Sequence, residues 1–246
     1  MKLKISLNSN RNIYLPKAFM YQIHALIYKY LPDDEAEWLH NSGYKYEKRS
    51  FKLFTFSSIL EHGQYNPKSE TFKFPASISF YIASPATWIL RDFSANLIKT
   101  QNLQLGNNEL YVNAVEVYKE KTPKTNEIKV KALTPIEVHS SLKKANGKHK
   151  TYYYHPHEDE FAEMVDANIR KKWESFYKEP CPHKLEITSL KNRYLKERVR
   201  FIKNIVIKGW VGDFILKSHP KLLQFALYAG LGSRNSVGFG MIEPHK

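Results

Sequence analysis

The chain has 246 residues, 42% of them hydrophobic, which is enough for one large core or two smaller ones. It carries 38 lysine and arginine residues against 24 acidic ones, and the formal net charge of +14 favours a polyanionic partner, nucleic acid before a membrane surface. The single cysteine, Cys181, excludes an intramolecular disulfide and a cysteine-rich zinc site and is typical of the reducing cytoplasm.

The first half of the chain predicts strands and helices in the order of the split β-α-β, or ferredoxin-like, unit. Strands are expected over residues 2–7, 51–57, 71–74, 77–83 and 110–118. Long helices are expected over residues 16–31 and 87–99. Between them, Asp33 and Asp34 can cap a short helical turn that Gly43 ends. The longest uncharged run, residues 74–90, is interrupted by prolines and is too short for a membrane span, so no membrane anchor is expected.

Three polar side chains in this half lie outside its predicted core. Tyr28 points away from the apolar face of the first helix, so core packing does not account for it. His40 lies near a helix C-terminus, where the partial negative charge favours a protonated imidazole. Lys52 lies at the start of the predicted second strand. Each also has an ordinary explanation, as a half-buried tyrosine, a surface histidine or a solvated lysine.

The second half is expected to repeat this plan after a polar linker over residues 119–129. A helix is expected over residues 161–177 and another over residues 220–229, where Pro220 suits the first turn. Strands are expected over residues 185–188, 199–208, 210–217 and 236–243, and the second and third would form a hairpin that turns at Gly209.

Basic residues gather at two places in this half. Residues 143–150 contain Lys143, Lys144, Lys148 and Lys150, and Tyr152, Tyr153 and Tyr154 follow. The second group comprises Arg193, Lys196, Arg198, Arg200 and Lys203. Lysines beside aromatic rings suit single-stranded RNA, although a solvated loop explains them as well. His155 and His157, which precede three acidic residues, form only a weak metal-ligand set, and we expect no metal or other cofactor.

Four of the ten glycines fall within residues 230–240, close to the C-terminus. A helix C-cap explains Gly230 and Gly232, but Gly238 and Gly240 lie inside the expected last strand, where glycine indicates close approach of another group. A dinucleotide fingerprint or a Walker loop would precede a helix, whereas this loop follows one. An anion would therefore be held by loop N–H groups and by Arg234.

This glycine loop, with a hydrophobic residue inside each glycine pair and a basic residue between the pairs, resembles that of the CRISPR-associated repeat-RNA processing endoribonucleases, members of the repeat-associated RNA-binding superfamily. Three further segments resemble that family: residues 26–28, residues 39–40 with 52–57, and the Thr-Pro-Ile at residues 134–136. The resemblance implies an α+β fold of two tandem ferredoxin-like domains, residues 1–122 with the active site and residues 123–246 with RNA-binding residues and the glycine loop.

The resemblance also implies metal-independent cleavage of CRISPR repeat RNA. The 2′-hydroxyl would attack the adjacent phosphate and leave a 2′,3′-cyclic phosphate and a 5′-hydroxyl. Tyr28, His40 and Lys52 match the family's catalytic tyrosine, histidine and lysine. His24 competes with His40, and Lys45, Lys48 or Arg49 with Lys52. The residues that would hold the RNA are Gly230, Gly232, Ser233, Arg234, Asn235, Gly238 and Gly240.

Other interpretations stay open at the level of sequence. Some members of the family bind RNA without cutting it, so the chain could be a non-catalytic RNA-binding subunit of a CRISPR effector complex. A basic RNA-binding protein outside CRISPR systems is a third interpretation. The partners implied are the precursor guide RNA and, less directly, other effector subunits or a second copy of the chain. His40 and Tyr28 are not assigned as base or acid by the sequence.

Overall fold

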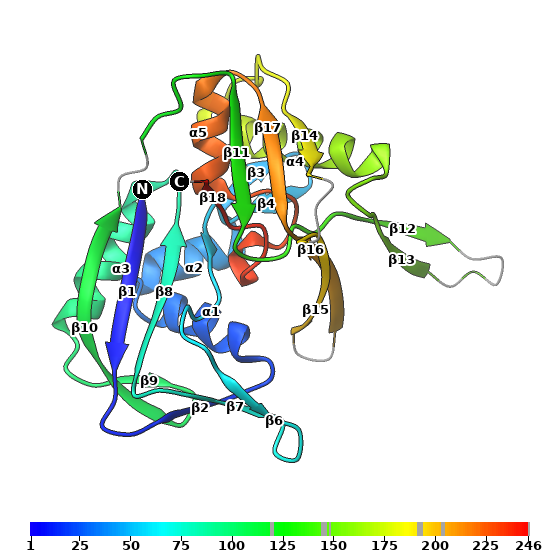
Figure 1. Ribbon diagram of the computed structural model, residues 1–246. Helices are drawn as coiled ribbons and strands as arrows, with labels where there is room; N and C mark the ends of the chain where they lie inside the picture. The colour runs from blue at the N-terminus through cyan, green and yellow to red at the C-terminus, as the bar shows by residue number, and fades with distance from the viewer. Residues whose placement is uncertain (119–120, 144–146, 148, 191–193, 203–204, 246) are drawn as a thin grey trace.

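The computed structural model describes residues 1–118, 121–143, 147, 149–190, 194–202 and 205–245. It is an α+β fold in which two antiparallel sheets lie beside each other, each covered by helices (Figure 1). Within the described residues, no helix combines the length and the apolar character needed to cross a membrane.

The N-terminal sheet has five strands in the order β5-β8-β1-β10-β9, all antiparallel. These are β1 (Lys2–Asn8), β5 (Thr55–Phe56), β8 (Ser77–Ala83), β9 (Leu103–Leu105) and β10 (Asn108–Tyr118). The helices of this half are α1 (Phe19–Lys29), α2 (Asp33–Asn41) and α3 (Thr87–Lys99). Ile5 of β1, Ile23 of α1 and Phe93 of α3 are fully buried in one core, so the sheet and the two longer helices are stabilised by the same apolar cluster.

The C-terminal sheet has four antiparallel strands in the order β14-β17-β11-β18. They are β11 (Glu127–Ala132), β14 (Glu186–Ser189), β17 (Asp213–Lys217) and β18 (Ile242–Pro244). Helices α4 (Asp159–Tyr177) and α5 (Pro220–Ala229) pack on it through a second core, which contains Ile169 and Leu223. In the N-terminal sheet β8 lies between β1 and β5, and in the C-terminal sheet β17 lies in the same way between β11 and β14. The two sheets therefore repeat one strand order.

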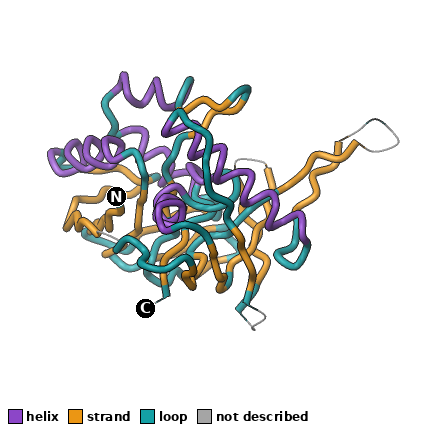
Figure 2. Tube along the Cα trace, turned by 90° about the horizontal axis from the view of Figure 1, so that it is seen from above, coloured by secondary structure: helices purple, strands orange, loops and turns teal. Residues whose placement is uncertain are grey.

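Smaller strand pairs extend from this body. A three-stranded sheet, β2-β7-β6, comprises β2 (Ile13–Pro16), β6 (Gln64–Asn66) and β7 (Thr71–Phe74). The hairpins are β3 (Tyr44–Tyr46) with β4 (Arg49–Phe51), β12 (His139–Lys143) with β13 (His149–Tyr153), and β15 (Lys196–Ile202) with β16 (Ile205–Val211). Figure 2 shows the β12–β13 hairpin extending well beyond the body of the molecule.

Four sequence predictions need correction. Helix α1 begins at Phe19 rather than at residue 16, which belongs to β2. Asp33 and Asp34 lie in the first turn of α2, and its N-cap residue is Pro32. The strand predicted over residues 199–208 is really the β15–β16 hairpin, so Gly209 lies inside β16 and pairs with Arg198. The last strand is only β18, because a 3₁₀ turn, η1 (Asn235–Val237), and glycines at positive φ precede it.

The strand predicted over residues 51–57 is also wrong around Lys52. The chain leaves β4 at Phe51 and enters β5 only at Thr55. Leu53 between them has a φ of 51° and is buried in the C-terminal core, whereas Phe54 is buried in the N-terminal core. The backbone turns here because the consecutive side chains of Leu53 and Phe54 pack in different cores. Lys52 therefore stands at the junction of the two halves.

Candidate active site

Helix α1 presents two polar rings, His24 and Tyr28, one helical turn apart on its half-exposed flank. Their ring centroids are 4.8 Å apart, and the Tyr28 ring lies 6.2 Å from that of His40, at the end of α2. The Tyr28 ring also packs edge-on against buried Phe54. The tyrosine thus lies between two histidines, with its aromatic body anchored on the core.

Lys52 joins this group through the backbone of His40. Its Nζ donates a hydrogen bond of 2.7 Å to the His40 carbonyl oxygen and lies 3.3 Å from Ser50 Oγ. Burial lowers the pKa of Lys52 below its ordinary value. Lys45 and Lys48, the competing lysines, lie exposed on the β3–β4 hairpin. Tyr28, His40 and Lys52 are therefore brought together from three segments of the N-terminal half.

The polar rings differ in what burial does to them. Burial raises the pKa of Tyr28 to about 12, which keeps its hydroxyl protonated at neutral pH. Burial is also the largest effect on His24 and lowers its pKa, although the hydrogen bond to Ser236 opposes this. His24 Nδ1 lies 2.7 Å from the Ser236 carbonyl oxygen and must donate to it, so a neutral His24 carries its lone pair on Nε2. His40 Nδ1 lies 2.9 Å from Asn41 Oδ1 on the exposed side.

The glycine loop, residues 230–240, runs from the end of α5 to β18 and contacts both halves. Its four glycines are buried and have φ between 65° and 88°. A Cβ at Gly240 would lie 1.9 Å from the Leu231 carbonyl oxygen, and one at Gly238 would lie 2.2 Å from Met20 of α1. Positive φ and close packing therefore account for these glycines within the protein.

Asn235 fixes the shape of this loop. Its Nδ2 donates to the carbonyl oxygens of Leu231 and Phe239, each at 3.0 Å. Thr55 Oγ1 of β5 donates to the same Phe239 oxygen at 2.9 Å. With the His24 contact to Ser236, these bonds hold the loop against the N-terminal half beside the three candidate catalytic groups.

The outer part of the loop consists of Ser233 and Arg234, of which Arg234 is exposed. Buried Glu137 lies beneath them: its backbone oxygen accepts a hydrogen bond of 2.7 Å from Ser233 N, and its Oε2 lies 3.7 Å from Arg234 Nε. His139 Nδ1 contacts the other carboxylate oxygen. Glu137 therefore positions Arg234, which the sequence predicts to bind RNA.

Lys172 of α4 holds the loop from the C-terminal side. Its Nζ donates to the carbonyl oxygens of Gly230 and Gly232, both at 2.8 Å. The side chain is fully buried, and burial lowers its pKa to about 7. Lys172 is not among the residues predicted from the sequence, although it recurs at helical spacing with Val165 and Ile169 on the buried face of α4. Glu137 and Thr55 are not among them either, because their partners in the glycine loop are distant in sequence.

Exposed basic residues lie on the two projecting hairpins. Lys143 and Lys150 are exposed on β12–β13, and Lys196 and Arg198 on β15–β16. Arg200 is half-buried. Other residues of these predicted basic groups, and the start of the predicted linker, lie outside the described residues: Lys144, Lys148, Arg193, Lys203 and residues 119–120.

The two histidines considered as metal ligands lie on the surface of the C-terminal half. His155 packs edge-on against Trp210 at 4.1 Å and lies 4.7 Å from the His157 ring. Among the described residues, no three or more histidine, cysteine, aspartate or glutamate side chains are grouped so that they could hold a metal ion.

The chain matches known proteins over its whole length. Residues 118–244 match the family model described as "CRISPR associated protein Cas6, C-terminal". The chain is 29% identical to CRISPR-associated endoribonuclease Cas6 1 of Methanocaldococcus jannaschii, over 98% of this chain and 92% of that protein. It is 24% identical to CRISPR-associated endoribonuclease Cas6 of Pyrococcus furiosus, over 96% of this chain and 86% of that one.

A solved structure described as "CRISPR associated protein Cas6" superposes on the chain with a TM-score of 0.80 and 27% sequence identity, and the match covers 100% of this chain and 99% of that one. The similarity thus extends across both sheets and the glycine loop.

Proposed function

Because this chain belongs to the Cas6 family of CRISPR-associated endoribonucleases and cleaves CRISPR repeat RNA, we propose that it does so without a metal ion, by attack of a 2′-hydroxyl on the adjacent phosphate. The observation that carries this proposal is the convergence of Tyr28, His40 and Lys52 beside the glycine loop. Such a reaction needs a base, an acid and a cation, and these three side chains can supply them.

In the proposed reaction, a base removes the proton of the 2′-hydroxyl while its oxygen forms a bond to phosphorus. The bond from phosphorus to the 5′-oxygen breaks, and an acid protonates that oxygen. The products are a 2′,3′-cyclic phosphate and a 5′-hydroxyl. Lys52 stabilises the extra negative charge on the phosphate oxygens, because its ammonium is partly desolvated where the charge develops.

The environment of Tyr28 favours a proton-donating role. With its pKa at about 12, the phenol stays protonated and can donate to a phosphate oxygen or to the departing 5′-oxygen. His40, which is exposed to solvent and to substrate, is then the base. His24 is the second histidine beside Tyr28. Its ring is fixed by the Ser236 carbonyl and is better suited to hold the loop and Tyr28 in place.

We further infer that the two halves are tandem ferredoxin-like domains, residues 1–122 and residues 123–246, with repeat RNA bound across them. The repeated strand order of the two sheets supports this, as do the helices that follow the first and third strands of each. The RNA backbone contacts the outer part of the glycine loop, above all Arg234, and the basic β12–β13 and β15–β16 hairpins.

The experiment that tests the catalytic assignment compares histidine variants. We expect His40→Ala to lower the cleavage rate by at least ~100-fold while changing RNA affinity little. His24→Ala should retain a larger share of activity, because it removes a positioning contact. Rates are measured at saturating enzyme in single turnover, with affinity measured separately. A larger loss for His24→Ala than for His40→Ala would transfer the role of base to His24.

A further inference from the structure

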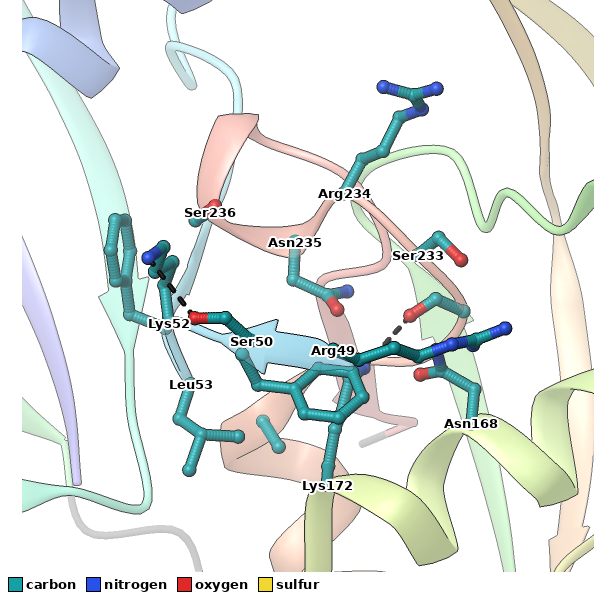
Figure 3. Close-up of a pocket in the computed structure, with 14 residues that line it drawn as sticks. Arg49, Ser50, Lys52, Leu53, Asn168, Lys172, Ser233, Arg234, Asn235 and Ser236 are labelled. Atoms are coloured by element: carbon teal, nitrogen blue, oxygen red, sulfur yellow. Dashed lines mark hydrogen bonds between the residues drawn. The ribbon is translucent and has the colours of Figure 1, made fainter. Parts of the chain in front are cut away.

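A pocket of about 370 Å³ lies directly beside the candidate catalytic groups (Figure 3). Its walls are the segment that joins β4 to β5, the glycine loop, and α4 of the C-terminal half. Lys52 lines this pocket and also bonds to the His40 backbone, so the pocket and the catalytic groups are contiguous. The volume falls within the roughly 300–1,000 Å³ of small-molecule sites, which is enough for one nucleotide.

The pocket is strongly cationic. Arg49, Lys52 and Arg234 line it together with Lys172, and none of the described residues that line it carries a carboxylate. Figure 3 shows Lys172 on its α4 wall, where the ammonium is held by two loop carbonyls. Arg234 already lies 3.7 Å from the Glu137 carboxylate, whereas no carboxylate lies within ion-pair distance of Arg49 or Lys52 among the described residues. Two neighbouring cations without an anion are unfavourable, and an anionic ligand would relieve this. The charge therefore suits a phosphate-bearing ligand.

Asn168 supplies a second, independent indication of a ligand. It lies one turn before Lys172 on α4, lines the pocket, and is only 7% exposed. Its side-chain oxygen has no hydrogen-bond partner among the described residues. An unpaired buried amide oxygen is unfavourable, and the χ2 torsion of asparagine rotates readily. A ligand that presents a donor group would satisfy it, and asparagine commonly pairs with the edge of adenine.

The pocket also offers an apolar surface. Half-buried Phe51 belongs to its lining, next to the polar wall of α4, whereas Phe54 is fully buried and packs against Tyr28. An aromatic ring beside cations is a usual means of holding an unpaired base with its phosphate. The shape, charge and lining are thus those of a site for one nucleotide unit.

We propose that this pocket binds one nucleotide of the RNA strand that flanks the cleaved bond, with the base edge on Asn168 and the phosphate beside Arg49, whose side chain points toward Asn168 (Figure 3). The proposal rests on the proposed function, since that function places the strand here. Asn168 is then a residue that determines which base is accepted. Lys172 is a positioning residue that holds the loop wall of the pocket.

The test measures the affinity of wild-type protein and of Asn168→Leu for a repeat RNA with a 2′-deoxy sugar at the cleaved bond, so that no cleavage occurs. The affinities of both proteins are also measured for a set of the same RNAs, each with one abasic site among the three nucleotides on either side of that bond. Comparing protein variant with RNA variant shows which base Asn168 contacts. Gln224→Leu is the matched control, because Gln224 bonds to Thr122, away from the pocket. Asn168→Asp serves as a second variant if Asn168→Leu does not fold.

We expect Asn168→Leu to weaken binding of the intact RNA about 5- to 100-fold, as for loss of one bidentate base contact. At one abasic position, wild type and variant should bind equally, and Gln224→Leu should behave as wild type throughout. Equal affinity of wild type and both Asn168 variants for the intact RNA would overturn the proposal. It would also be overturned if the variant bound every abasic RNA more weakly than wild type by the same factor as it binds the intact RNA. Failure of wild-type protein to cut the all-ribose RNA would instead contradict the proposed function.

Discussion

Two ionisable side chains of the candidate active site, Tyr28 and Lys52, owe their pKa shifts to burial. Tyr28 is packed between two histidines and Phe54, so that its hydroxyl is kept protonated, whereas Lys52 is partly desolvated against the His40 backbone. A protonated phenol and a desolvated ammonium are both donors that can be aimed at a phosphate. Proton removal is then left to a histidine.

Tyr28→Phe tests this division of roles. We expect a ~10- to 100-fold fall in the single-turnover rate at neutral pH, because one donor to the phosphate or the leaving oxygen is lost. Since the Tyr28 pKa is about 12, the wild-type rate should show no ionisation of this group below pH ~10. A rise in wild-type rate between pH 8 and 9.5 that the variant lacks would show that Tyr28 acts as a base.

Lys172 gives a prediction about stability. Its folded pKa of about 7 lies below the ~10.4 of an unfolded lysine, so unfolding takes up a proton between these values. The free energy of unfolding should therefore rise with pH in that window, by up to ~1.4 kcal/mol per pH unit, and should be constant in this respect below it. The charged groups that share its pocket, Arg49, Lys52 and Arg234, are all basic.

The measurement is urea unfolding from pH 7 to pH 10, for wild type and Lys172→Met. The difference between the two proteins should change with pH, because the variant lacks this proton uptake. Lys171→Met, which removes the half-exposed neighbouring lysine, should retain the wild-type slope. Parallel curves for wild type and Lys172→Met would contradict the assignment of a lowered pKa.

At the scale of elements, the glycine loop belongs to the C-terminal half and packs against the N-terminal half through hydrogen bonds to Thr55 and His24. Gly240 has a φ of 67°, and a Cβ there would meet the Leu231 carbonyl oxygen. We expect Gly240→Ala to destabilise the protein by about 2–4 kcal/mol and to reduce cleavage as the loop shifts.

Gly147→Ala is the control for that substitution. Gly147 also has a positive φ, of 77°, but no atom lies within 4 Å of the position of its Cβ. Gly147→Ala should lower the free energy of unfolding by only ~1 kcal/mol, which is the backbone penalty alone. Thermal or urea unfolding of both variants separates the two contributions, and equal costs would mean that close packing at Gly240 is unimportant.

Periodic elements could be predicted from the sequence, and elements shaped by distant contacts could not. Helix α3 matches its predicted bounds of residues 87–99, and α5 those of residues 220–229, because apolar spacing and Pro220 mark them locally. Leu53 breaks its predicted strand because it packs in the second core, which no local pattern reveals. Tyr28, His40 and Lys52 were named from resemblance to a family, but Asn168 and Lys172 become functional candidates only when α4 meets the glycine loop.

At the scale of the whole molecule, the net charge of +14 and the exposed hairpins predict RNA affinity that depends strongly on salt. The slope of log affinity against log salt should be about −0.7 for each phosphate contacted in a single strand. Arg234→Ala should make this slope less steep by about 0.7, which corresponds to the loss of one phosphate contact. Arg91→Ala is the control, because exposed Arg91 pairs with Asp92 on α3. An unchanged slope for Arg234→Ala would remove Arg234 from the RNA interface.

The central claim, cleavage by a 2′-hydroxyl without a metal ion, is tested most directly with two labelled repeat RNAs in excess EDTA. One is all-ribose, and the other carries a single 2′-deoxy sugar immediately upstream of the cleaved bond. We predict that the first is cut to a 2′,3′-cyclic phosphate and a 5′-hydroxyl, and that the second is bound but left intact. Cleavage of the 2′-deoxy RNA, or loss of all cleavage in EDTA that Mg²⁺ restores, would contradict the account.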